Sequence, residues 1–307
     1  MTLVRNLAWA AALVCVFAST ASAAESTPKD DASVPPGKYL LRYKFALGET
    51  MRYEVKQSTS LRTSMEKTTQ RNSSQTESVK VWKVTDVLPT GEMEFIHLVE
   101  SVKMSNEGTN QPKRSFDSTS SAPPATGFEA AARAIGVPLV QVRISPSGKI
   151  LSREQKTSQQ EAPSPDMPIT LELPEQAIRL GERWSHSYDV PVKKASGAEV
   201  KIRTRRLCLL RQVKNGVATI DVEYQILTPV DATLRSQIID RLTKGSIRFD
   251  IERGRVVQQT HEVDRREIGF APTNQASSMH LTARTTERLL TSEPAVAEVV
   301  PASAEIK

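Results

Sequence analysis

Residues that could do chemistry are few in this chain of 307 residues, and they lie far apart. No two histidines have His-x-x-x-His spacing, and none is spaced from Cys208 as in a structural zinc site. The chain has no G-x-S-x-G turn, no phosphate-binding P-loop and no G-x-G-x-x-G motif after a strand. We therefore expect a non-enzymatic protein with no cofactor and no metal site. The four histidines are His97, His186, His261 and His280.

Two of these histidines have aromatic neighbours on the same face of an expected strand. His97 shares a face with Phe95, and His186 alternates with Trp184 and Tyr188. One interpretation is that all five side chains line a mostly apolar pocket for a ligand. The alternative is that the histidines are core or rim residues whose hydrogen bonds are satisfied within the protein.

Carboxylates recur without a pattern that requires catalysis. Glu262 and Asp264 point to the face of their strand opposite His261, so we expect a solvated strand there. Glu49 and Glu182 each follow a glycine at a strand entry, and a pair of facing carboxylates could share acid and base work. A polar turn at each strand entry explains both residues without catalysis, and we prefer that interpretation.

The other local feature is a basic run of Lys201, Arg203, Arg205 and Arg206, with Arg211 beyond it. Lys201, Arg203 and Arg205 lie on one strand face, opposite Ile202 and Thr204. This pattern predicts the solvent face of an amphipathic strand. The alternative is a patch that binds an anionic surface, such as lipid headgroups or cell-wall polymers. The net charge of +6 is spread over the whole chain, and we expect no nucleic-acid partner.

The first residues indicate export. Arg5 precedes an apolar run from Leu7 to Ala18 that is too short to span a bilayer, and Ala21-Ser22-Ala23 supplies a cleavage site. We expect a signal peptide at 1–23, a periplasmic or secreted mature protein, and no transmembrane span in the mature chain. Cleavage removes Cys15 and leaves one cysteine, so we expect no intramolecular disulfide.

Two stretches of the chain are nearly the same, Phe45–Tyr53 and Ile178–His186, and a similar order of elements follows each. This indicates an internal repeat. Stretches rich in Ser, Thr and Pro at 105–126 and 155–168 are expected to be disordered. The expected divisions are a disordered linker at 24–37, a first β module at 38–154, a linker at 155–168, a second β module at 169–291 and a disordered tail at 292–307.

Alternation of apolar and polar residues dominates both modules and predicts half-buried antiparallel strands. Asn215-Gly216 predicts a hairpin, and Gly148 and Gly254 predict turns between the last strands of each module. Helical spacing interrupts the strands near Phe128–Ile135 and Leu234–Leu242. The predicted fold is mainly β, of the α+β kind, with two tandem modules of curved antiparallel sheet, each crossed by one short helix. The pattern leaves open whether the two modules share one sheet.

The signal peptide, the Leu-Gly-Glu strand starts at 47–49 and 180–182, and the strand-Gly-strand endings at Gly148 and Gly254 resemble a domain-of-unknown-function family of exported bacterial proteins. The layout is also distantly similar to the half-barrels of periplasmic lipoprotein carriers, which hold acyl chains in an apolar hollow. Neither resemblance assigns a functional residue.

The function expected from these features is the binding of an apolar or amphiphilic ligand, such as a lipid, at the cell envelope. The alternative is an envelope scaffold that contacts other proteins through sheet edges and has no small-molecule ligand. The third possibility is an enzyme of another type, which turnover of a generic hydrolase substrate would support if a change of His97 or His186 abolished it.

Overall fold

The computed structural model describes residues 35–156, 170–194, 196–271, 274 and 276–293, with side chains described up to residue 290. The predicted signal peptide, the linker at 24–37 up to residue 34, the linker at 155–168 from residue 157 and the tail from residue 294 lie outside the described residues.

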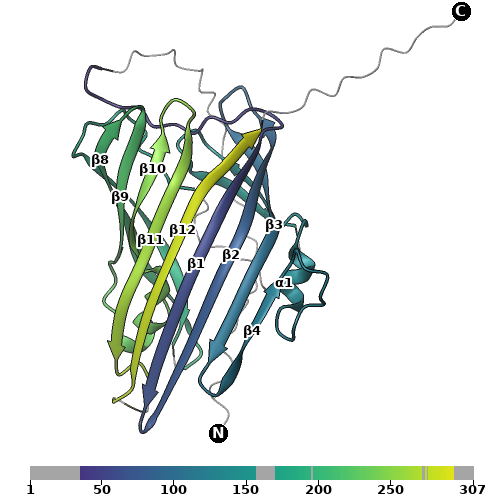
Figure 1. Ribbon diagram of the computed structural model, residues 1–307. Helices are drawn as coiled ribbons and strands as arrows, with labels where there is room; N and C mark the ends of the chain where they lie inside the picture. The colour runs from purple at the N-terminus through teal and green to yellow at the C-terminus, as the bar shows by residue number, and fades with distance from the viewer. Residues whose placement is uncertain (1–34, 157–169, 195, 272–273, 275, 294–307) are drawn as a thin grey trace, which may run out of the picture.

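Twelve strands of the described part form one antiparallel sheet, in the order β6-β5-β3-β2-β1-β12-β11-β10-β9-β8-β7, with β4 paired to β3 (Figure 1). The prediction of a mainly β fold is confirmed. The strands are β1 (Thr50–Met65), β2 (Thr68–Val87), β3 (Met93–Gly108), β4 (Gln111–Asp117), β5 (Val140–Ile144), β6 (Ile150–Gln155), β7 (Arg183–Lys193), β8 (Glu199–Lys214), β9 (Val217–Ile226), β10 (Lys244–Asp250), β11 (Arg255–Ile268) and β12 (Ser278–Glu293).

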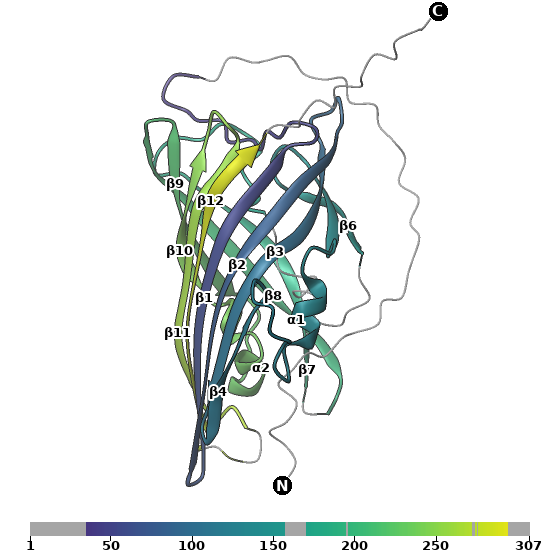
Figure 2. The same cartoon turned by 45° about the vertical axis from the view of Figure 1, so that its right-hand side comes forward.

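The two predicted modules share this single sheet, because β1 of the first pairs with β12 of the second along nearly its whole length. The sheet is strongly curved, and the two short helices lie on its inner side (Figure 2). A division into two modules, each crossed by a helix, stays a prediction.

Local sequence explains most of the strands. In β8, Ile202, Thr204 and Cys208 are buried while Lys201 and Arg203 are exposed, as alternation requires. The predicted hairpin between β8 and β9 is also confirmed. Asn215 and Gly216 have φ angles of 51° and 73°, the positive values that a tight hairpin turn uses.

A strap of extended chain, residues 39–46, crosses one end of the sheet and pairs with the turns on both sides. The backbone N–H of Tyr43 donates to the carbonyl of Pro146, and that of Lys44 donates to the carbonyl of Gly254. A Cβ at Gly148 would come within 2.4 Å of the Tyr43 ring, and one at Gly254 within 2.5 Å of the Lys44 nitrogen. Both turns therefore need glycine for close approach as well as for their positive φ.

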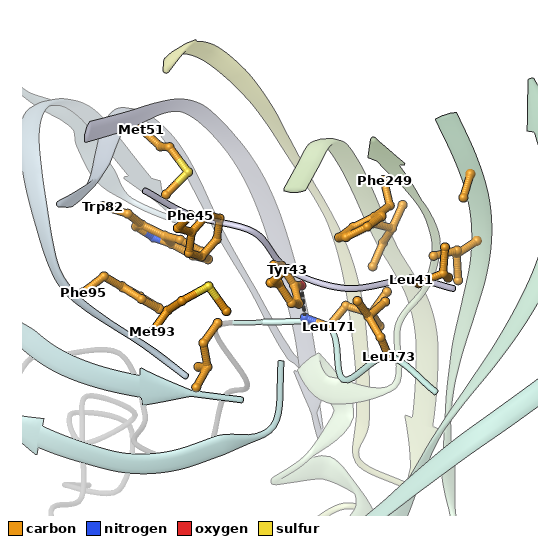
Figure 3. Close-up of a cluster of buried hydrophobic side chains, with 14 of the residues drawn as sticks. Leu41, Tyr43, Phe45, Met51, Trp82, Met93, Phe95, Leu171, Leu173 and Phe249 are labelled. Carbon is orange, nitrogen blue, oxygen red and sulfur yellow. Dashed lines mark hydrogen bonds between the residues drawn. The ribbon is translucent and has the colours of Figure 1, made fainter. Parts of the chain in front are cut away.

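The strap fills that end of the inner face with apolar side chains. Tyr43 packs edge-on against Phe249, and its hydroxyl accepts a hydrogen bond from the backbone N–H of Leu171 at 3.0 Å (Figure 3). Phe45 packs edge-on against Phe95, which itself stacks on Trp82 with ring centroids 4.5 Å apart. The largest buried cluster of the described residues lies here.

The helices are shorter than the helical spacing suggests. α1 (Glu129–Ala134) packs against β3 and β4, and α2 (Ala232–Ser236) is followed by the single 3-10 turn η1 (Ile239–Arg241). Asp231 caps α2 by accepting a hydrogen bond from the N–H of Leu234 at 2.8 Å. Ile239 of η1 is buried against β11 and β12.

Disorder at 105–126 was a wrong prediction for much of that range. β3 continues to Gly108, and β4 pairs with it from Gln111 to Asp117. Phe116 explains this order, because its ring is buried against Phe128 with ring centroids 6.0 Å apart. One well-placed apolar side chain anchors a strand that is otherwise polar.

Candidate ligand cavity

The inner face of the sheet holds a cavity of about 480 Å³, next to the apolar end that the strap fills. Its walls come from strands of both predicted modules, and η1 contributes Asp240 and Arg241. This volume lies within the range of pockets that bury small molecules, which is roughly 300–1,000 Å³. The apolar lining residues include Leu139, Val140, Leu171, Val222, Ile247, Val263 and Leu281.

Arg206 is the most unusual residue of the lining. Its side chain is buried with a relative exposure of 7%, although its charge disfavours burial. Nη1 donates to the carbonyl of Thr170 at 3.2 Å, and the guanidinium lies 5.0 Å from the centroid of the Tyr224 ring. Nε has no hydrogen-bond partner, and no carboxylate forms an ion pair with Arg206 within the described ranges.

A second buried cation of the cavity does have a counter-charge. Lys80 Nζ lies 2.5 Å from Glu287 Oε1, and the side-chain exposures of the two are 15% and 10%. Gln259 donates a hydrogen bond to the other carboxylate oxygen of Glu287 at 3.0 Å. The ammonium of Lys80 also lies 5.0 Å from the ring of Trp82. The charges of Lys80 and Glu287 therefore offset each other inside the protein.

Two tyrosines lie beside Arg206. The rings of Tyr188 and Tyr224 meet edge to face with centroids 6.5 Å apart. Burial raises the pKa of both hydroxyls, while the positive charges of Arg206 and Arg241 act on both in the opposite direction. Both hydroxyls therefore stay protonated at neutral pH, and both lie within the electrostatic reach of two guanidinium groups.

Two histidines of the lining are neutral at physiological pH. Burial lowers the pKa of His97 to about 3, helped by the nearby charges of Lys80 and Arg153. Burial lowers the pKa of His261 to about 4, with a further lowering by Arg206. Neither ring therefore adds positive charge to the cavity at pH 7.

The five residues predicted to line a pocket are spread over three environments. His97 and Tyr188 line the cavity. Phe95 is fully buried in the apolar cluster. Trp184 packs against that cluster and its Nε1 donates to the carbonyl of Glu172 at 2.9 Å, while Nδ1 of His186 lies 3.1 Å from a carboxylate oxygen of the same glutamate.

In the basic run, Lys201, Arg203 and Arg205 lie on the opposite, outer face. Lys201 and Arg203 are exposed, and Nη2 of the half-buried Arg205 donates to Gln225 Oε1 at 2.6 Å. Arg203 contacts Asp189 at 3.4 Å. The structure therefore has the solvent-exposed strand face that the alternation predicts.

His261 was expected on a solvated strand, but it lies half-buried in the cavity wall. The paired glutamates do not form an acid–base pair. Glu49 is buried against Arg255 and accepts a hydrogen bond from the N–H of Ala46 at 3.0 Å, whereas Glu182 is exposed. Glu49 therefore anchors the strap, in line with the structural role preferred from the sequence.

Among the charged residues of the cavity, Arg206, Lys80 and Glu287 were not predicted from the sequence to line a pocket. A signal for Arg206 was present, because its even register places it with Ile202, Thr204 and Cys208 on the buried face of β8. A charged side chain on the buried face of a strand needs a partner within the protein or a ligand to compensate its charge.

No family model and no curated protein matches this chain significantly. Among solved structures the chain is similar to lipovitellin, a structure that describes lipid–protein interactions, with 14% identity and a TM-score of 0.45. That match covers 83% of this chain and 26% of lipovitellin, so the chain spans about a quarter of its length.

Two further solved structures are similar at lower scores. DynF of the dynemicin biosynthesis pathway of Micromonospora chersina has 8% identity and a TM-score of 0.22, with 87% of this chain and 94% of DynF covered. A DUF1329 family protein of Desulfovibrio piger has 11% identity and a TM-score of 0.15, with 77% and 84% covered.

The described residues contain neither a membrane-spanning helix nor a metal-binding cluster. No helix there has the length and apolar character needed to cross a membrane. No group of three or more His, Cys, Asp or Glu side chains in the same residues could hold a metal ion. The one cysteine described, Cys208, is buried, and burial raises the pKa of its thiol to about 12.

Proposed function

We propose that this protein is an exported, non-enzymatic binder of an amphiphilic small molecule, held in the cavity on the inner face of its sheet. The cavity itself is the observation that supports this most. Its volume of about 480 Å³ suits a small ligand, and its lining combines apolar side chains with a few buried polar and charged groups. Such a lining matches a molecule with one apolar and one polar part.

Position in the sheet supports the same proposal. The strap and the apolar cluster fill one end of the inner face, while the neighbouring stretch between Lys80 on β2 and Arg206 on β8 stays open. If this part of the sheet served only to stabilise the fold, its side chains would be expected to fill the space to the packing density of other protein interiors.

An envelope scaffold is the second candidate, and the ends of the sheet favour it. In the described part of the chain, β6 and β7 each pair with a single strand, so each offers one free edge. A partner protein could add a strand at either edge. Such a partner would leave the cavity without a role.

Native mass spectrometry of the protein purified from its own host, followed by organic extraction, tests the proposal. We expect a bound amphiphile at one copy per chain. The matched variants are Thr285→Phe and Thr286→Phe, because these neighbours on β12 lie on the inner and outer faces respectively. Thr285→Phe should lose the ligand and Thr286→Phe should keep it. Equal retention by two folded variants would contradict the proposal, and a partner protein that binds both equally would favour the scaffold.

A further inference from the structure

A buried guanidinium without a counter-ion marks one place in the cavity. Arg206 is 93% buried by its 7% exposure, and its partners in the described structure are the carbonyl of Thr170 and the ring and hydroxyl group of Tyr224. Removing a charge from water is costly unless an opposite charge or several hydrogen bonds compensate. The carbonyl of Thr170 and the ring of Tyr224 compensate only in part, because neither carries a full negative charge.

Nearby carboxylates do not supply the missing charge. Glu287 is engaged by Lys80 at 2.5 Å and by Gln259 at 3.0 Å. Asp240 is also part of the lining, but burial raises its pKa, and the charge that acts against this shift is that of Arg241. Asp240 and Glu287 are the two carboxylates among the described residues that line the cavity.

Hydrogen-bond donors surround the same place. The hydroxyl groups of Tyr188 and Tyr224 lie within the electrostatic reach of Arg206, and Nε of Arg206 has no partner in the described structure. A planar guanidinium with free N–H groups suits the oxygens of a carboxylate or a phosphate. Apolar residues continue the lining beside it, among them Val222 and Leu171.

We propose that Arg206, flanked by Tyr188 and Tyr224, binds the anionic head of the ligand, so that the ligand class is an alkyl carboxylate or alkyl phosphate. This inference rests on the proposed function, since the apolar part of the same cavity takes the alkyl chain. The negative charge of the ligand then compensates the buried positive charge of Arg206.

Binding of four probes to the purified, delipidated full mature chain tests this, with affinities measured by calorimetry. The probes are laurate, dodecyl phosphate, dodecanol and inorganic phosphate. We expect laurate or dodecyl phosphate to bind at least about tenfold more tightly than dodecanol, a difference of about 1.4 kcal/mol. The stronger of the two anions identifies the head group.

The matched variants are Arg206→Met and Arg205→Met, which remove neighbouring guanidiniums on the inner and outer faces of β8. Arg206→Met should weaken binding of the alkyl anions by about tenfold or more and leave dodecanol unchanged, while Arg205→Met should change neither. Unchanged anion binding in Arg206→Met would overturn the inference.

Outcomes separate the two proposals. If neither laurate nor dodecyl phosphate binds more tightly than dodecanol, the amphiphile site is kept and the anion site is overturned. Binding of inorganic phosphate alone would keep the anion site and overturn the amphiphile site. No binding by any probe overturns both. Thermal unfolding of the unmodified protein provides a readout that needs no variant, because laurate or dodecyl phosphate should raise Tm more than dodecanol does at the same concentration.

Discussion

The two halves of the inner face differ although the same strands build both. At the strap end, Trp82, Phe95 and Cys208 are buried in a close-packed apolar cluster. Two residues further along the same strands, the inner face carries Lys80, His97 and Arg206, and a cavity replaces the packing. The side chains change from apolar to charged within one row, and under the proposed function the first half supports the fold while the second half holds the ligand.

The largest effect should come from the packed half. Phe95→Ala removes a ring that is fully buried and stacked on Trp82 at 4.5 Å, so we expect the free energy of unfolding to fall by about 3–5 kcal/mol. Urea denaturation measures this. Thr285→Ala in the cavity half is the control and should change stability by less than about 1 kcal/mol, since its side chain already lines a space. Similar losses for both variants would remove the distinction between the halves.

A second large effect on stability is expected at the two Leu-Gly-Glu turns, the first of which follows the strap. Both turns make the same backbone hydrogen bonds: Gly48 N–H to Val84 O at 3.1 Å, and Gly181 N–H to Leu210 O at 2.8 Å. Their glutamates differ in burial, because Glu49 pairs with the buried Arg255 while Glu182 is exposed.

Glu49→Gln should therefore cost about 3–5 kcal/mol of unfolding free energy, because it leaves the charge of Arg255 buried without its carboxylate. Glu182→Gln should cost less than about 0.5 kcal/mol. Chemical denaturation of the two variants in parallel checks this. An equal effect at both positions would show that the shared backbone turn, rather than the buried pair, anchors the strap.

A smaller effect concerns pH and belongs to the cavity half. The pKa of His97 is about 3 and that of His261 about 4 in the folded protein, both below the usual 6.5. Between pH 6.5 and 4 the unfolded chain binds more protons than the folded one, so stability falls as pH falls. We expect each of the two histidines to contribute a loss of about 2–3 kcal/mol over this interval.

Unfolding curves at several pH values test the pH effect with histidine-to-glutamine variants. His97→Gln with His261→Gln should flatten the dependence between pH 6.5 and 4, and His280→Gln, which changes an exposed ring, should leave it as it is. An unchanged slope in the double variant would assign the pH dependence to other groups.

The sequence predicted the mainly β fold because alternation is a local signal, and it predicted the hairpin at Asn215-Gly216 because that turn type needs particular residues. It missed the strap, because the burial of Leu41, Tyr43 and Phe45 depends on turns that lie more than a hundred residues away in the chain. Phe95 was assigned to a pocket because alternation shows which face of the strand it occupies. Whether a position on that face lies in the packed cluster or in the cavity depends on where the strap crosses the sheet, and alternation does not show this.

Arg206 tests the central claim most directly, because a residue kept for a ligand need not stabilise the empty protein. The measurement is the free energy of unfolding of Arg206→Met beside the unmodified protein, both delipidated, by urea denaturation. Burying a charge without a counter-ion costs free energy, so an apolar side chain of similar length at this buried position should not destabilise the ligand-free protein. We predict that Arg206→Met is at least as stable as the unmodified protein without ligand and loses the stabilisation by alkyl anions. A loss of about 2 kcal/mol or more in the ligand-free variant would contradict the claim and make Arg206 part of the fold's own support.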